Sequence, residues 1–259
     1  MKKVILLLIL PLLCIARIQV TTYMPLEQFF LEKIASTNVV TKNITYFYSP
    51  KKKNLSKADL IALARTKAYF HFGLDIEKEY AKILKDINPR LKVYDLSKGV
   101  RKVDNNPYFW TDPLLLRKTI HNIYDALVEL TYFNKEFYKQ NRDNLLARLD
   151  KTFLKLKDKL YQSTIYNVYV YNDYWYYFAK RFSINLYKKE KKLIKVDEIK
   201  PIQDFVDTKN IKMVLIRNEE NLGYALSVNS HTKLPIKKHN IFDNLYFLNM
   251  ERLSLKFTK

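Results

Sequence analysis

A helical pattern of unusual length in the middle of the chain limits the folds that this sequence can adopt. It begins at Asp112-Pro113, where a capping carboxylate precedes a proline in the first turn, and it runs to about Leu160 with one break near Phe133-Asn134. Its second half keeps apolar residues at helical spacing, at Leu145, Leu146, Leu149, Phe153, Leu156 and Leu160. A helix of this length predicts a rigid connector between two lobes.

Strands and short helices alternate on both sides of this connector. Before it, the pattern predicts strands at 18–23, 38–48, 68–72 and 91–96, and helices at 25–35, 55–65 and 75–84. After it, the pattern predicts strands at 166–171, 184–187 and 212–216, and helices at 174–182 and 199–208. This order is typical of βα units with a mostly parallel sheet. The predicted fold is α/β, with two βα lobes at 17–130 and 164–259 joined by a long backbone helix at 131–163.

The first residues, MKKVILLLILPLLCIA, have the layout of a signal peptide. Two lysines are followed by an apolar run from Val4 to Leu13 that is short for a membrane span, and Cys14-Ile15-Ala16 gives a small-x-small cleavage site. We therefore predict a signal peptide over 1–16 and a periplasmic or otherwise exported protein. Lipidation of Cys14 is the alternative, which is disfavoured because Leu13 stands where a small residue is needed.

Removal of residues 1–16 leaves no cysteine, because Cys14 is the only one in the chain. A disulfide, a thiolate zinc site and a cysteine nucleophile are then excluded. No second apolar stretch reaches membrane-spanning length, so we expect a soluble mature protein without a transmembrane segment.

The formal net charge of +20 is the second prominent feature of the sequence. Such a charge is typical of nucleic-acid binding, but export and the even spread of lysines along the chain argue against a nucleic-acid partner. A solvated lysine surface is the simplest interpretation, and an anionic partner or an anionic membrane face are the functional ones. No enzyme is expected, because no Ser/His/Asp order, paired-carboxylate site or phosphate loop stands out, and three glycines argue against a nucleotide cradle.

Five segments of the chain together resemble a known family. They are VTTYMPLEQFFLEKI (20–34), LSKADLIALARTKAYFHFGLDIE (55–77), VYDLSKGV (93–100), NPYFWTDPLLLRKTIHNIYDAL (106–127) and YNDYWYYFAKRFSI (171–184). In this order and spacing they are similar to the zinc- and manganese-binding receptors of bacterial ABC importers, the ZnuA/TroA-like solute-binding proteins of cluster A-I. The resemblance implies two α/β lobes joined by a long helix, with a metal ion held in the cleft between them.

The resemblance also implies a ligand set that this chain lacks. The family holds its metal with three histidines, or with two and a glutamate, plus a carboxylate near the C-terminus. The matching positions here are Lys51, Tyr108, Asn172 and Lys238, of which Lys51 and Lys238 are aligned only to within a residue or two. Lysine is cationic near neutral pH, tyrosine titrates near ~10 and asparagine is a weak neutral donor. We therefore expect no cofactor, and zinc or manganese only if this alignment is wrong.

Two further residues are candidates for the cleft. His239 lies next to Lys238, and Asp173 directly follows Asn172. Asp173 is also predicted to begin the helix at 174–182, as Asp112 is predicted to cap its own helix. His71 and His121 are expected to be structural, and the aromatic run 174–178 is expected to pack, with one or two rings lining the cleft.

The sequence therefore predicts an exported receptor, monomeric and partnered by an ABC importer permease, with lost or much weakened metal binding. Two alternatives stay open. One is a receptor for a different, anionic or organic, solute. The other is a non-transporting interaction or adhesion module of the cell envelope, in which Lys51 and Lys238 pair with carboxylates such as Asp173 and hold the lobes closed around a metal-free cleft.

Overall fold

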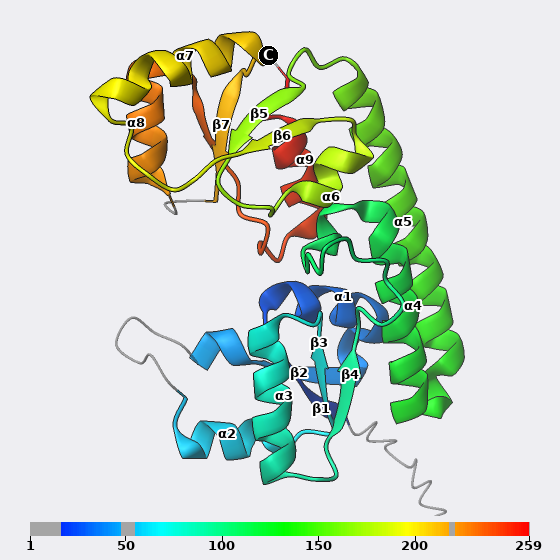
Figure 1. Ribbon diagram of the computed structural model, residues 1–259. Helices are drawn as coiled ribbons and strands as arrows, with labels where there is room; N and C mark the ends of the chain where they lie inside the picture. Colours follow the sequence, from blue (N-terminus) through cyan, green and yellow to red (C-terminus); the bar gives the residue numbers. More distant parts are fainter. Residues whose placement is uncertain (1–16, 48–54, 218–220, 259) are drawn as a thin grey trace, which may run out of the picture.

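The computed structural model describes residues 17–47, 55–217 and 221–258, and it contains two parallel sheets in separate lobes (Figure 1). The first sheet consists of β1 (Ile18–Thr22), β2 (Val39–Asn43), β3 (Ala68–His71) and β4 (Lys92–Asp95), in the spatial order β2-β1-β3-β4. Its helices are α1 (Pro25–Ala35), α2 (Lys57–Ala64) and α3 (Asp75–Ile87). All residues of the central strand β3 are buried, as expected for a parallel strand covered on both faces.

The second sheet repeats this arrangement in the C-terminal part of the chain. It consists of β5 (Asn167–Val170), β6 (Asn185–Lys188), β7 (Met213–Ile216) and β8 (Ile236–Lys238), in the order β6-β5-β7-β8. Its helices are α6 (Tyr176–Arg181), α7 (Ile199–Thr208), α8 (Leu222–Thr232) and α9 (Tyr246–Ser254). The predicted fold class, two mostly parallel βα lobes with a long helix, is confirmed.

The long helical region runs along both lobes (Figure 1). It consists of α4 (Pro113–Leu130), the short 3-10 turn η4 (Tyr132–Asn134) and α5 (Lys135–Tyr161), so the predicted break lies where the sequence placed it. The amide of Asn141 donates to the Ile34 carbonyl in the first lobe at 2.9 Å, and Lys155 pairs with Glu251 of α9 at 2.9 Å. One apolar core includes residues of both sheets and of α5. The division at 17–130, 131–163 and 164–259 stays a prediction.

One strand is shorter than its sequence predicts. The pattern at 38–48 predicts a strand throughout, but β2 ends at Asn43 and the 3-10 turn η2 (Ile44–Phe47) follows. The Asn43 side-chain oxygen accepts the Thr45 amide at 3.0 Å and the Thr45 hydroxyl at 2.6 Å. This local turn competes with further pairing to β1, which explains the early end of the strand.

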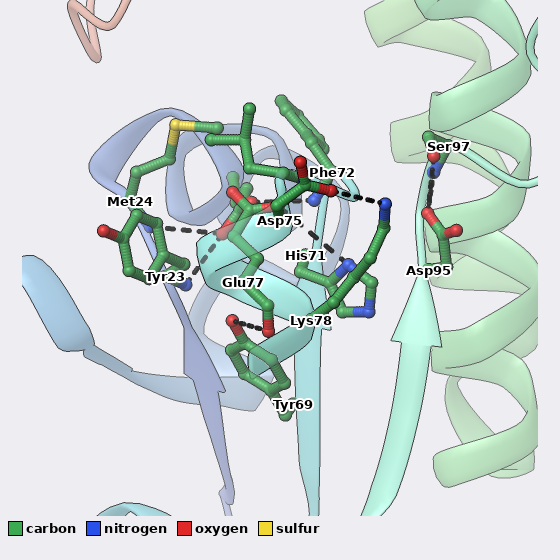
Figure 2. A network of polar contacts seen from close by, with 12 residues as sticks. Tyr23, Met24, Tyr69, His71, Phe72, Asp75, Glu77, Lys78, Asp95 and Ser97 are labelled. Atoms are coloured by element: carbon green, nitrogen blue, oxygen red, sulfur yellow. Dashed lines mark hydrogen bonds and ion pairs between the residues drawn. The ribbon is translucent and has the colours of Figure 1, made fainter. Parts of the chain in front are cut away.

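Two fully buried carboxyl groups join α1 and α3 to the end of β3 (Figure 2). Glu27 Oε2 accepts the amides of Tyr23 at 2.7 Å and Met24 at 3.2 Å, and its Oε1 accepts the Phe72 amide at 2.8 Å. Glu77 Oε2 accepts the Leu74 amide at 2.8 Å. The two carboxyl groups lie close enough for each to influence the protonation of the other. The pair therefore satisfies the backbone donors at the starts of both helices.

This carboxyl pair holds a proton at neutral pH. Burial, and then the neighbouring Glu77, raises the pKa of Glu27 well above its usual range, and burial raises the pKa of Glu77 to about 7. Both oxygens of Glu27 already accept backbone N–H groups, whereas Glu77 Oε1 is buried and accepts none. At least one of the two carboxyl groups is therefore protonated at neutral pH.

We expect the Glu77→Gln variant to lose part of the pH dependence of stability. The folded pKa of Glu77 is raised above its unfolded value of 4.5, so its stabilisation is complete below about pH 4.5 and is lost as pH rises through about 7. The glutamine side chain in this variant does not titrate. Denaturant titrations at about pH 5 and about pH 8 should show a smaller difference in the free energy of unfolding for this variant than for wild type.

The matched variant is Glu27→Gln, which puts an NH2 group against backbone N–H groups. We expect it to lower the free energy of unfolding by about 2 kcal/mol more than Glu77→Gln at about pH 5, because buried donors then lack acceptors. Equal losses in the two variants would contradict the role of Glu27 as the acceptor of three backbone N–H groups.

Candidate ligand-binding cleft

The carboxyl ends of the two sheets face each other between the lobes (Figure 1). The loop after β4 leads through Tyr108 into the short turn η3 (Phe109–Thr111), and the loop after β5 carries Asn172 and Asp173. Ligands of open α/β sheets bind beyond the carboxyl ends of parallel strands. These two loops are therefore the first place to look for a ligand site.

A pocket of about 500 Å³ lies between these loops. Tyr108 contributes from the first lobe, and the second lobe contributes Tyr171, Asn172, Asp173, Tyr174 and the run Lys188, Lys189, Glu190 and Lys191. The structure thus brings together Tyr108, Asn172 and Asp173, three of the residues that the sequence singled out. Lys51 lies outside the described residues. Lys238 is exposed at the end of β8 and does not line this pocket.

The ring of Tyr108 is part of an aromatic cluster. Its centroid lies 4.8 Å from that of Tyr174, 5.5 Å from Trp110 and 6.2 Å from Phe242, each in an edge-to-face arrangement. The Arg217 guanidinium lies 5.1 Å from the ring centres of both Tyr174 and Phe242. These contacts involve both lobes, so the ring at 108 contributes to interlobe packing. Arg217 and Phe242 were not predicted here, because no local motif marks them.

Hydrogen bonds between the lobes fix the wall of this pocket. Asn106 donates its side-chain amide to the Asp173 carbonyl at 3.0 Å. The Tyr177 hydroxyl accepts the Val103 amide at 2.9 Å and donates to the Asn106 carbonyl at 2.9 Å. The Trp110 indole donates to the Ile241 carbonyl at 2.9 Å. The loop before η3 is thereby held directly against the second lobe.

The carboxylate of Asp173 pairs with Lys188 at the end of the adjacent strand β6. The prediction that Asp173 begins a helix at Tyr174 is wrong, because α6 starts at Tyr176. The Tyr176 amide bonds to the backbone carbonyl of Asp173, at 3.2 Å, and not to its carboxylate. In the alternative in which Lys51 and Lys238 pair with carboxylates, Asp173 is a partner already occupied by Lys188. Parallel pairing of β5 with β6 places Lys188 opposite Val170, and this register could not be read from the sequence.

His239 is buried with both ring nitrogens in use. Its Nδ1 accepts the Trp175 indole N–H at 3.0 Å, and its Nε2 lies 3.3 Å from the Asn249 carbonyl, to which it donates in the matching tautomer. Burial lowers the pKa of His239 to about 4, so the ring is neutral at physiological pH. These bonds leave no nitrogen lone pair for a metal ion, which argues against the candidate cleft role of His239.

Asp112 has the capping role that its position predicts, together with a second role. Its Oδ1 accepts the Leu114 amide at 2.9 Å in the first turn of α4. The Arg181 guanidinium of α6 donates to the same carboxylate at 3.0, 2.9 and 2.8 Å. A nearly buried carboxylate thus joins the start of the long helical region to the second lobe.

Metal-ligand chemistry is sparse in this part of the molecule. Within residues 17–47, 55–217 and 221–258, no group of three or more His, Cys, Asp or Glu side chains is placed to hold a metal ion. The same ranges contain no helix that is both long and apolar enough to cross a lipid bilayer.

A family model described as "Zinc-uptake complex component A periplasmic" matches residues 20–252 of the chain. The chain belongs to this family. Members of this zinc-uptake family are binding components that work with ABC permeases, not enzymes. No curated protein matches the chain at the sequence level.

Solved structures with the same fold agree with this assignment. A crystal structure of ZnuA is 22% identical, covers 93% of this chain and 97% of its own, and has a TM-score of 0.81. The metal-dependent lipoprotein YcdH from Bacillus subtilis is 15% identical, with coverages of 92% and 98% and a TM-score of 0.75. The laminin-binding protein Lbp of Streptococcus pyogenes is 19% identical, with coverages of 93% and 98% and a TM-score of 0.75. At these identities the likeness concerns the fold.

We expect Asp112→Ala to lower the free energy of unfolding by about 3 kcal/mol, because it removes a helix cap and leaves Arg181 without its partner. The matched control is Asp173→Ala, whose ion pair with Lys188 is half exposed and worth about 1 kcal/mol or less. Denaturant titration of both variants measures the difference. A loss at Asp112 no larger than that at Asp173 would contradict the linking role of Asp112.

Proposed function

We propose that this chain is an exported solute-binding protein of an ABC importer in which metal binding at the interlobe cleft is lost or much weakened. The permease of the importer is its partner, and the protein acts as a monomer. The observation that carries the proposal is the setting of Tyr108 and Asn172, which stand at the family's ligand positions and line one pocket. Neither side chain is a good donor for zinc at neutral pH.

The surroundings of these two residues support the same conclusion. The nearest candidate carboxylate, Asp173, already pairs with Lys188. Lys188, Lys189 and Lys191 line the pocket against two acidic residues, Asp173 and Glu190. A divalent cation that entered would have to displace Lys188 from Asp173 and then remain near its ammonium group, which Coulomb repulsion disfavours.

Calorimetric titration of chelator-treated protein with zinc and then manganese tests this proposal, together with elemental analysis of the protein as purified. We expect no co-purified metal and no stoichiometric binding tighter than about micromolar. Tight one-to-one binding of either ion would overturn the proposal and return the protein to ordinary metal import.

A gain-of-binding variant gives the complementary test. We expect the triple variant Tyr108→His, Asn172→His and Lys188→Ala to bind zinc at least about tenfold more tightly than wild type, because it supplies two imidazoles and releases Asp173. The matched control places histidines at two exposed tyrosines outside the pocket, Tyr161→His and Tyr166→His. An equal gain in both variants would show that added histidines bind zinc wherever they lie.

The lysines favour a second candidate, a receptor for an anionic solute. Lys188, Lys189 and Lys191 come from one short segment and line the pocket beside the Tyr108 and Asn172 side chains, which are hydrogen-bonding groups. Calorimetric titration with inorganic phosphate, and with citrate as an organic anion, tests this candidate. Binding that is lost in Lys189→Gln and weakens with added salt would support it, and heat signals indistinguishable from dilution would dismiss it for these anions.

A further inference from the structure

The turn between α4 and α5 presents large aromatic side chains to solvent. Phe133 is 102% exposed, Tyr132 is 67% exposed and Phe137 is 46% exposed. The backbone beneath them is well anchored, because the buried Tyr138 hydroxyl bonds to the Thr131 hydroxyl at 2.8 Å and to the Asn134 amide at 3.3 Å. We call Tyr132, Phe133 and Phe137 the aromatic tip. A built turn that exposes such rings is typical of an interaction site.

Several basic residues lie at the same end of the molecule as the aromatic tip. Parallel strands begin at one edge of their sheet, and Arg17 and Lys67 directly precede β1 and β3 while Lys92 opens β4. Lys92 pairs with Glu129 in the last turn of α4 at 2.7 Å, which places this edge beside the tip. Lys135 and Lys139 lie in the first turns of α5. Arg17, Lys67 and Lys139 make no ion pair within the described part of the chain.

The chain also enters the fold at this end. β1 begins at Ile18, and the start of this strand lies at the same end of the molecule as the lower ends of α4 and α5 (Figure 1).

We propose that the aromatic tip and the basic residues at its end of the molecule dock the protein on an anionic phospholipid surface. Aromatic rings favour the headgroup level of a bilayer, and lysine and arginine side chains are attracted to anionic lipids. The exposed area is small and has basic residues of α5 and of the adjacent sheet edge at the same end of the molecule, which suits lipid headgroups better than an apolar protein groove. The site is separate from the interlobe pocket, because α4 has 18 residues and spans about 27 Å between them.

Sedimentation with lipid vesicles tests the proposal on the chain from Arg17 onward, which contains every described helix and strand. Vesicles of pure phosphatidylcholine are compared with an equal mixture of phosphatidylcholine and phosphatidylglycerol. We expect binding to the mixed vesicles, weakened by salt, and a loss of about tenfold or more in the variant Tyr132→Ser and Phe133→Ser. Lys135→Gln with Lys139→Gln should also weaken binding, mainly at low salt.

The matched control removes exposed apolar side chains elsewhere, with Tyr161→Ser and Leu193→Ser, which are 85% and 61% exposed in wild type. This control should bind as wild type does, and circular dichroism should show that all variants fold. The variant Phe133→Cys, whose cysteine is the only one in the chain from Arg17 onward, carries an environment-sensitive dye that should shift to the blue on the mixed vesicles. Membrane docking would be overturned by an absence of binding, by an equal loss in the tip and control variants, or by an unchanged dye spectrum. If no vesicles bind, the tip would instead be left as a protein-binding surface.

Discussion

The carboxylate of Asp112 is the contact on which the arrangement of the two lobes depends most directly. It caps α4 through the Leu114 amide and accepts the Arg181 guanidinium of α6, and it is nearly buried. Because the residue just before it ends η3, the same contact fixes Trp110, whose indole donates to the Ile241 carbonyl. Tyr108 is then placed against Tyr174 across the lobes. A change in this one ion pair would therefore move the wall of the pocket as well as the helix.

The contacts around Tyr108 offer a way to hold the lobes together that needs no metal. A metal ion with ligands from both lobes couples their positions through a few strong bonds. Here the same neighbourhood contains edge-to-face rings, worth about 1 kcal/mol a pair, and hydrogen bonds such as that from Asn106 to Asp173, worth about 1 kcal/mol each. Several such contacts give a few kcal/mol that do not depend on a bound ion. This is why a weakened metal site and an intact interlobe arrangement are compatible.

Local patterns predicted much of the fold because periodicity and capping act over a few residues. The helix at 199–208 has the predicted bounds, and the break near Phe133-Asn134 lies in η4. The helix α8, whose apolar residues show little helical periodicity, and the three-residue strand β8 gave too little pattern to find. At the site, the family resemblance predicted that Tyr108 and Asn172 would lie in one cleft, and both line the same pocket. Lys188 and Arg217 were missed because their places follow from strand register and tertiary packing. The two hydrogen bonds that occupy the ring nitrogens of His239 also follow from tertiary packing, and nothing in the sequence marks them.

The large positive charge has different consequences at the two ends of α4. Near the pocket, lysines take part in folded contacts: Lys188 pairs with Asp173, and Lys189 lies 3.8 Å from the centre of the Phe205 ring. Near the aromatic tip, Arg17 and Lys67 make no ion pair within the described residues, so their field extends into solvent. A net charge that only kept the chain soluble would not need exposed phenyl and phenol rings beside it, because such rings lower solubility. The combination is physically consistent with an anionic lipid surface, where the charge and the rings contribute together, and docking at the tip leaves the pocket at the opposite end of α4 open to its ligand.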